Sequence, residues 1–188
     1  MQPLFWQKAG ITPPHLKTYR RTTMTADLHK ANTMSIPPAP PSHPAFPPVA
    51  TLVPHAAPML LIDRILNAND DSMTAEVTIQ PDSMFCDAND GVPGYVGIEY
   101  IAQTVSAYSG WRAQKANEGA SDAKPKIGYL LGTRKMTLAV DAFKPGDRLE
   151  ITVKNVFEDG EMGVFDGTVR CHQQVIVSAR VNVYQPDT

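Results

Sequence analysis

The sequence predicts an α+β fold in which an antiparallel sheet packs against one apolar helix. Residues 97–111 repeat apolar side chains at three- and four-residue spacing, which is the period of a helix face. Other segments alternate apolar and polar residues, as strands with one buried face do. Most of these strands follow one another with no helical segment between them, which is typical of antiparallel pairing.

The expected elements run in the order strand, helix, then consecutive strands. Met73 to Gln80 alternates as a half-buried strand, with Ala75, Val77 and Ile79 on one face. The helix carries no charge between Glu99 and Arg112, so we expect it to be buried on most sides. Further strands are expected over residues 127–138, 147–157, 163–171 and 175–184, the last two joined by a turn at 172–174.

Composition narrows the class of protein. The chain has 188 residues, a 43% hydrophobic fraction and a net charge of -2, which gives no electrostatic reason to expect a nucleic-acid or membrane-surface binder. Two cysteines, Cys86 and Cys171, are too few for a disulfide framework and are expected to be reduced. Neither a membrane-length apolar run nor a signal peptide is recognisable, so we expect a cytoplasmic protein.

Residues 1–50 differ from the remainder, which we expect to form one domain over residues 51–188. They hold ten of the 17 prolines, which exclude a helix or a central strand. We expect a disordered, partly polyproline-like tail. The tail could dock to a proline-binding domain. Alternatively, the assigned translation start could lie too early, with Met24 and Met34 as candidates for a later start.

Four segments, in order and spacing, carry a family resemblance. They are Val53–Ile65 (VPHAAPMLLIDRI), Pro93–Gln103 (PGYVGIEYIAQ), Phe143–Asp147 (FKPGD), and the closing pair Val164–Cys171 and Val175–Ala179. These segments are similar to the hotdog-fold 3-hydroxyacyl-(acyl carrier protein) dehydratases of fatty acid synthesis, and closer still to the divergent branch found with aryl polyene pathways. The resemblance implies a hotdog fold, in which the antiparallel sheet wraps around the long apolar helix.

This resemblance implies dehydration of a 3-hydroxyacyl thioester on an acyl carrier protein to the trans-2-enoyl thioester. The reaction needs a base near C2, an acid near the leaving hydroxyl and a donor to the thioester oxygen. Glu99 matches the family's carboxylate, and Gly94 matches the backbone N–H that serves as oxyanion donor. Tyr95, Gly97 and Gln103 occupy neighbouring motif positions and are candidate substrate-binding or packing residues.

Glu99 also stands out without the resemblance. It is the only acidic residue in the apolar helix and lies in its first turn. Burial favours the neutral form of a carboxyl group, and a helix N-terminus favours the charged form. A partly protonated carboxyl suits a general acid; the alternative is a charge that simply complements the helix end.

The family's catalytic histidine is missing from its loop, because residues 84–91 contain no histidine. Three explanations stay open. His55, from the entry segment, could be the base, or it could be a turn histidine bonded to backbone. Asp87 or Cys86 could substitute. The chain could also be a weakly catalytic or non-catalytic acyl-binding subunit of a dehydratase heterodimer.

The remaining expectations concern charged residues, metal and cofactor motifs, and assembly. Arg134 and Lys135 could contact phosphopantetheine or the carrier protein, or could be the charged end of a strand. No cysteine or histidine pair has ligand spacing and no phosphate loop is present, so neither a metal nor a cofactor is expected. His172 is expected to be exposed. A homodimer or a heterodimer would suit the fold, and a thioesterase in which Glu99 activates water is the alternative enzyme.

Overall fold

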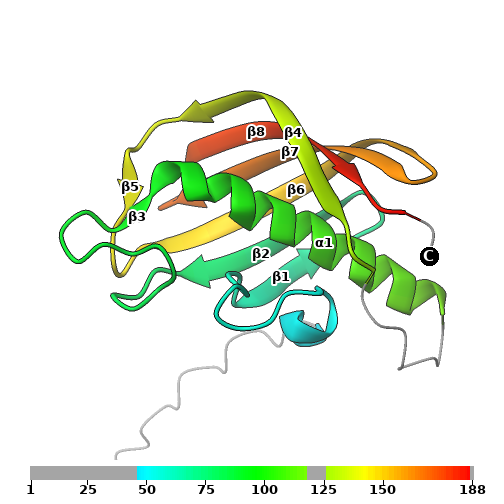
Figure 1. Cartoon of the computed structure of the whole chain (residues 1–188), viewed down its shortest axis with the longest axis horizontal. Helices are drawn as coiled ribbons and strands as arrows, with labels where there is room; N and C mark the ends of the chain where they lie inside the picture. Colours follow the sequence, from blue (N-terminus) through cyan, green and yellow to red (C-terminus); the bar gives the residue numbers. More distant parts are fainter. Residues whose placement is uncertain (1–45, 118–125, 187–188) are drawn as a thin grey trace, which may run out of the picture. The chain divides into compact units, whose positions relative to one another are not determined.

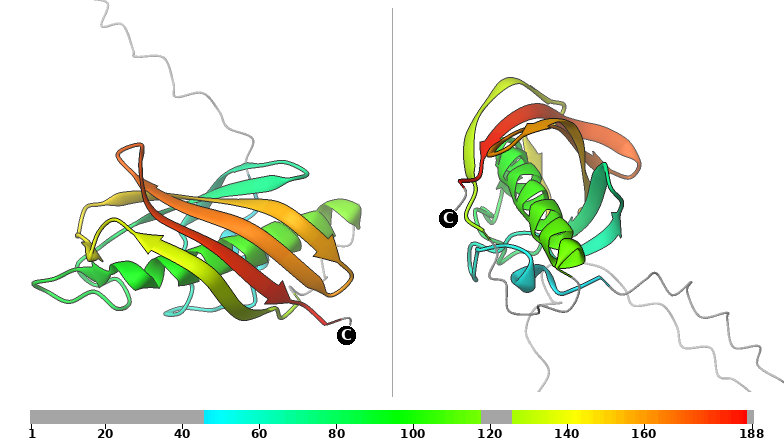
Figure 2. Two further views of the ribbon diagram at one scale, coloured as in Figure 1. Left: turned by 90° about the horizontal axis from the view of Figure 1, so that it is seen from above. Right: turned by 90° about the vertical axis from the view of Figure 1, so that its right-hand side faces the viewer.

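A long helix, α1 (Gly97–Ala116), lies along the concave face of a curled antiparallel sheet (Figure 1). The structure is a computed structural model that describes residues 46–117 and 126–186. Seen along the helix, the strands curl around α1 (Figure 2). This arrangement is a hotdog fold, as the sequence predicts.

The main sheet has six strands in the order β1-β2-β6-β7-β8-β4, with every neighbouring pair antiparallel. A second sheet pairs two short strands beside the start of α1. The main strands are β1 (Arg64–Ala68), β2 (Ser72–Thr78), β4 (Tyr129–Leu138), β6 (Arg148–Asp159), β7 (Met162–Cys171) and β8 (Gln174–Tyr184); the short ones are β3 (Val92–Pro93) and β5 (Ala142–Phe143).

The core forms between α1 and the inner face of the sheet. Along β6, Leu149, Ile151 and Val153 are fully buried and alternate with outward-facing polar residues. On the helix, Ile101 and Tyr108 are among the most buried side chains. The opposite helix face, with Ala102 and Ser106, is only partly buried, so the sheet covers one side of α1 and leaves the other side available for a site.

The segment before β1 packs beneath the helix (Figure 1). It includes a single 3-10 turn, η1 (Val49–Thr51), in which Val49 is 4% exposed, and Phe46 packs against the same core. Residues 46–50, which the sequence predicts to belong to the tail, are thus part of the packed structure. The rest of the predicted tail, residues 1–45, lies outside the described residues.

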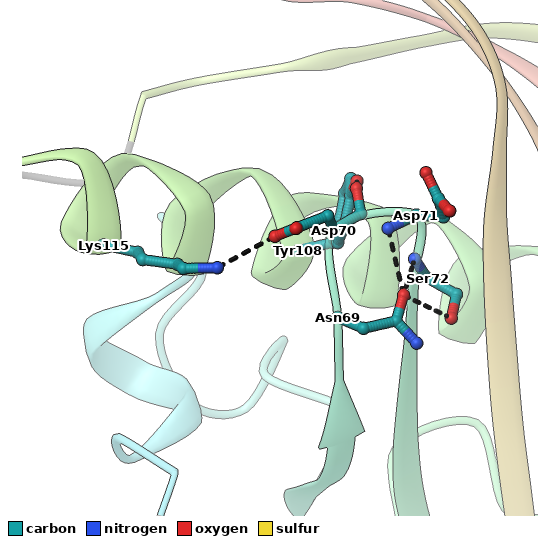
Figure 3. A network of polar contacts seen from close by, with 6 residues as sticks. All are labelled: Asn69, Asp70, Asp71, Ser72, Tyr108 and Lys115. Atoms are coloured by element: carbon teal, nitrogen blue, oxygen red, sulfur yellow. Dashed lines mark hydrogen bonds and ion pairs between the residues drawn. The ribbon is translucent and has the colours of Figure 1, made fainter.

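The turn between β1 and β2 anchors the C-terminal half of α1 (Figure 3). Asn69 Oδ1 accepts hydrogen bonds from backbone N–H groups of the turn and from the Ser72 hydroxyl. The carbonyl of Asp70 accepts a 2.5 Å bond from the Tyr108 hydroxyl, and its carboxylate pairs with Lys115 at 2.8 Å. These contacts fix the helix against the sheet edge.

Several elements differ from the sequence-based expectation. Strands β1, β3 and β5 were not predicted, and α1 continues five residues beyond Trp111 to Ala116. The sequence also favours a polar loop over residues 119–126, which lies largely outside the described residues. Among the residues that the structure describes, no helix is long and apolar enough to cross a membrane.

Candidate functional site

Glu99 lies in the first turn of α1 and is half-buried on the helix face that points away from the sheet core. Ala102, Ser106 and Ser109 follow it at spacings of three, seven and ten residues, so the four side chains form one stripe along the helix. This stripe is one wall of a cavity of about 110 Å³.

The opposite wall of the Glu99 cavity comes from the sheet. Tyr129 and Leu130 at the start of β4 and Tyr184 at the end of β8 line it. The rings of Tyr129 and Tyr184 are stacked, with centroids 6.5 Å apart. A cavity with mostly apolar walls and one carboxyl group suits a substrate with an apolar chain and one reacting polar centre.

His55 enters the same cavity from the loop before β1. It is partly buried and lines the cavity together with Glu99. Its Nδ1 is buried and has no hydrogen-bond partner among residues 46–117 and 126–186. A buried ring nitrogen without a partner costs free energy, so it requires an explanation. A hydrogen bond from a ligand in the cavity is one such explanation. The alternative that His55 is a turn histidine bonded to backbone through Nδ1 does not fit, because Nδ1 has no partner among the described residues.

Gln103 connects Glu99 to the loop that carries His55. The Gln103 side chain is fully buried. Its Nε2 donates to Glu99 Oε1 at 3.0 Å and to the Met59 carbonyl at 2.7 Å, while its Oε1 accepts the Leu61 N–H at 2.8 Å. Gln103 therefore positions the carboxyl group and holds the entry loop over the helix.

Gly94 does not fit the expected oxyanion role in this chain. Its N–H donates a 2.7 Å hydrogen bond to the Asp141 carbonyl and is not free to meet a substrate. Gly94 is buried in the short 3-10 turn η2 (Gly94–Val96) that leads into α1. The expectation is corrected: Gly94 fixes the helix start against the segment before β5.

Two other residues of the motif, Tyr95 and Gly97, do not line the Glu99 cavity. Tyr95 is 65% exposed and does not line the Glu99 cavity. Gly97 is buried, and a Cβ at this position would lie 3.1 Å from a methyl group of Val177 and 3.3 Å from the Phe143 ring. Gly97 therefore permits close packing of the helix on the sheet rather than contact with the cavity.

The rival bases in the loop are not brought to the cavity. Asp87 is exposed, and its Oδ1 accepts the backbone N–H groups of Asn89 and Asp90 at 2.8 and 3.2 Å. These bonds lower the pKa of Asp87, which makes it a weaker base. Cys86 lies beside it, with its thiol directed to the Asp87 carbonyl at 3.6 Å.

A different hollow lies on the other side of the helix start, between the entry loop and residues 82–84. Tyr100 lines it and packs against Phe143 with ring centroids 6.0 Å apart. Burial, with smaller contributions from Cys86 and Asp63, raises the pKa of Tyr100 to about 12. The phenol is therefore neutral at physiological pH.

Arg134 and Lys135 lie apart from the Glu99 cavity. They line a groove over β4, β7 and β8 with Asp166 and Arg180, which form a bidentate ion pair at 2.7 Å. Neither Arg134 nor Lys135 has an ion-pair partner within the described part of the chain. The groove thus carries an excess of positive charge.

Sequence reasoning missed several residues of the cavity. Ser106 and Ser109 could have been found from helical spacing, because they share the face of Glu99. Tyr129 and Tyr184 could not, since their position depends on the pairing of β4 with β8. His172 is exposed, as predicted.

Comparisons with known proteins give the family and the fold of this chain. A family model described as ApeP-like, ApeP dehydratase, matches residues 47–188. A chain of the dehydratase heterocomplex ApeI:P from Xenorhabdus doucetiae is 33% identical, with a TM-score of 0.71, covering 77% of this chain and 94% of that one. The 3-hydroxyacyl-[acyl-carrier-protein] dehydratase FabZ of Shewanella woodyi is 28% identical over 138 residues, which are 71% of this chain and 86% of the relative.

A more distant structure shares the fold alone. A hypothetical thioesterase protein with coenzyme A from Streptococcus pneumoniae is 13% identical, with a TM-score of 0.50, covering 66% of this chain and 86% of that one.

Proposed function

The chain belongs to the ApeP-like dehydratase family, and we propose that it dehydrates 3-hydroxyacyl thioesters on an acyl carrier protein to trans-2-enoyl thioesters. The observation that carries this proposal is that Glu99 and His55 line one cavity, with His55 Nδ1 buried and unpaired among the described residues. An acid and a base that face one mostly apolar cavity are two of the three groups that this elimination requires.

Each group has a defined role in the proposed reaction. The neutral imidazole of His55 takes the proton from C2, and the electron pair of that C–H bond forms the new double bond. Glu99 in its neutral form gives a proton to the C3 hydroxyl, which leaves as water. Because Gln103 occupies Glu99 Oε1, the other carboxyl oxygen is the one available to the substrate.

The cavity walls suit the acyl chain. Ala102, Val105 and the stacked Tyr129 and Tyr184 supply apolar surface, while Ser106 and Ser109 add hydroxyl groups deeper along the helix. Once an acyl chain fills the cavity, apolar walls would strengthen the polar interactions at the reacting carbons.

The carrier protein would dock at the positive groove. Arg134 and Lys135, which have no ion-pair partner among the described residues, offer their positive charges to a phosphate or to acidic side chains. Strand rise places Arg134 roughly 13 to 17 Å along β4 from Tyr129 and Leu130 at the cavity. A flexible prosthetic arm can span this distance while its thioester reaches Glu99.

A second candidate function is favoured by one observation, the histidine-free loop at residues 84–91. In this alternative the chain is the non-catalytic partner of another hotdog dehydratase chain. The relative from Xenorhabdus doucetiae belongs to a dehydratase heterocomplex, and in this alternative the present chain forms a heterodimer in the same way.

Incubation of the purified full-length chain with a 3-hydroxyacyl carrier protein, followed by mass spectrometry, separates these functions. We expect loss of water from the acyl group, and its abolition in Glu99→Gln and His55→Gln. The matched control Glu150→Gln, on the exposed outer face of β6, should retain turnover. Release of a free acid would point to a thioesterase, and no turnover by the isolated chain would favour the partner-subunit function.

Asp87→Asn tests the rival base. The amide oxygen of asparagine preserves the acceptor for the Asn89 and Asp90 N–H groups, so the loop should keep its conformation. Unchanged dehydration in this variant is expected; a large loss would move the base from His55 to Asp87.

A further inference from the structure

Two turns of the hotdog domain bring together three metal-ligand side chains away from the Glu99 cavity. Asp147 immediately precedes β6, Cys171 ends β7, and His172 begins the turn to β8. One carboxylate oxygen, the Cys171 sulfur and one His172 ring nitrogen all lie within 4.8 Å of one another. None of the three residues lines the Glu99 cavity.

We propose that Asp147, Cys171 and His172 bind one Zn²⁺ ion. Oxygen, sulfur and imidazole nitrogen are all common zinc ligands, whereas a sulfur ligand disfavours Mg²⁺ and Ca²⁺. Zinc–ligand bonds of roughly 2.0 to 2.3 Å place tetrahedral ligands roughly 3.3 to 3.6 Å apart. The outermost pair of donor atoms therefore needs to close by about 1 Å, which side-chain rotation can supply.

Backbone hydrogen bonds hold Asp147 and Cys171 close to each other. Asp147 Oδ2 accepts the Lys144 N–H at 2.7 Å, which orients the carboxylate and leaves Oδ1 for a metal. Pairing of Leu149 with Cys171 holds the ends of β6 and β7 together. Asp147 and Cys171 therefore meet through the sheet register, although they are far apart in sequence.

His172 lies in a turn with an unusual backbone conformation. It adopts φ 48° and the following Gln173 adopts φ 67°, a left-handed conformation for which glycine and asparagine are the usual residues. A histidine kept in this conformation places its ring beside the Cys171 thiol. Cys171 is 9% exposed and His172 is exposed, so a metal ion can enter from solvent.

The proposed ion would join two turns of the fold. Three protein ligands leave a fourth position for water, and the thiol proton passes to solvent when zinc binds. Because the folded chain would bind zinc and the unfolded chain would not hold a formed site, binding should raise the thermal midpoint. Spacing along the chain does not reveal these three residues as a group, because the pairing of β6 with β7 brings them together.

Titration of the metal-free full-length chain with Co²⁺, used as a spectroscopic probe for Zn²⁺, tests the proposal. We expect one equivalent to produce a sulfur-to-cobalt charge-transfer band that Zn²⁺ then displaces. Cys171→Ser should abolish the band, and His172→Gln or Asp147→Asn should weaken affinity at least about tenfold. Cys86→Ser, which removes the other thiol of the chain, is the matched control and should retain the band.

The thermal midpoint gives a second readout on the same variants. Zn²⁺ should raise the midpoint of the wild-type chain and of Cys86→Ser, but not that of Cys171→Ser. A metal-free midpoint for Cys171→Ser close to wild type would show that the variant folds. A band that survives Cys171→Ser, or binding that none of the three ligand variants weakens, would overturn the proposal and indicate adventitious binding.

Discussion

Replacement of Gln103 by leucine removes three hydrogen bonds of one fully buried side chain. The Leu61 N–H is buried and loses its partner, which costs about 1 to 3 kcal/mol. The Met59 carbonyl belongs to a residue that is 36% exposed, so water can replace the lost donor at little cost. Glu99 loses one neutral donor, worth about 1 kcal/mol at a half-buried position.

These contributions predict that Gln103→Leu lowers the free energy of unfolding by about 2 to 4 kcal/mol. For a domain of this size, that corresponds to a fall of roughly 5 to 10 °C in the thermal midpoint. The freed Glu99 carboxyl and entry loop should also lower kcat about 10- to 100-fold, with a smaller change in KM, because Gln103 positions the reacting groups.

Urea unfolding and dehydration kinetics on the same preparation measure both effects. Gln114→Leu is the matched control, because it lies on the same helix and its Nε2 donates a single exposed 3.0 Å bond to the Thr51 carbonyl. The control should change stability by less than about 0.5 kcal/mol and leave kcat unchanged. Equal stability and equal kcat in the two variants would refute the role assigned to Gln103.

Further predictions concern the frame of the site. The hydrogen bond from Arg180 lowers the pKa of Asp166, so their ion pair stabilises the fold at pH values above the ordinary aspartate pKa. This contribution is lost as the pH falls through the lowered pKa. In urea unfolding, Asp166→Asn should therefore be less stable than wild type near neutral pH, by under about 1 kcal/mol, and equally stable in acid. Gly110→Ala should cost about 2 kcal/mol in urea unfolding despite the better helix propensity of alanine, because its Cβ would lie 2.1 Å from the Leu52 carbonyl oxygen. Tyr108→Phe should cost about 1 kcal/mol through loss of its bond to the β1–β2 turn.

Each of these predictions has a contradicting result. A stability difference between wild type and Asp166→Asn that persists unchanged in acid would exclude the ion pair as its cause. A Gly110→Ala chain more stable than wild type would mean that propensity outweighs the clash. Equal unfolding midpoints for Tyr108→Phe and wild type would show that the hydroxyl bond contributes nothing net.

Local pattern was sufficient to predict most of the fold. The alternation of Leu149, Ile151 and Val153 identifies β6, and the spacing of Ile101 and Tyr108 identifies α1. Strand β1 lacked such a signal, because Ile65 is its only buried residue. It is stabilised instead by pairing with β2.

Helix α1 continues beyond its apolar pattern for a related reason. The segment after Trp111 has no apolar period, but Arg112 pairs with Glu158 at 2.6 Å and Lys115 pairs with Asp70 at 2.8 Å. Ion pairs with distant strands and turns stabilise the last turns of the helix, and hydrophobic spacing along the sequence does not report them.

The residues of the candidate site also differ in how far the sequence predicts their positions. Glu99 and Gln103, four residues apart on one helix, could be placed together from spacing alone. The position of His55 depends on the path of its loop, which Gln103 fixes through contacts 42 and 44 residues away in sequence. The Gly94 prediction was wrong about its N–H because the motif does not reveal the Asp141 carbonyl that occupies it.

A double-mutant cycle between Glu99 and His55 tests the central claim most directly. The dehydration rates of wild type, Glu99→Gln, His55→Gln and the double variant would be compared on one acyl carrier substrate. Each single variant should lose about 10²- to 10⁴-fold, and the double variant should be little slower than the slower single variant, because the two groups act in one step. Full dehydration activity in Glu99→Gln, or strictly multiplicative losses in the double variant, would contradict a shared acid–base site.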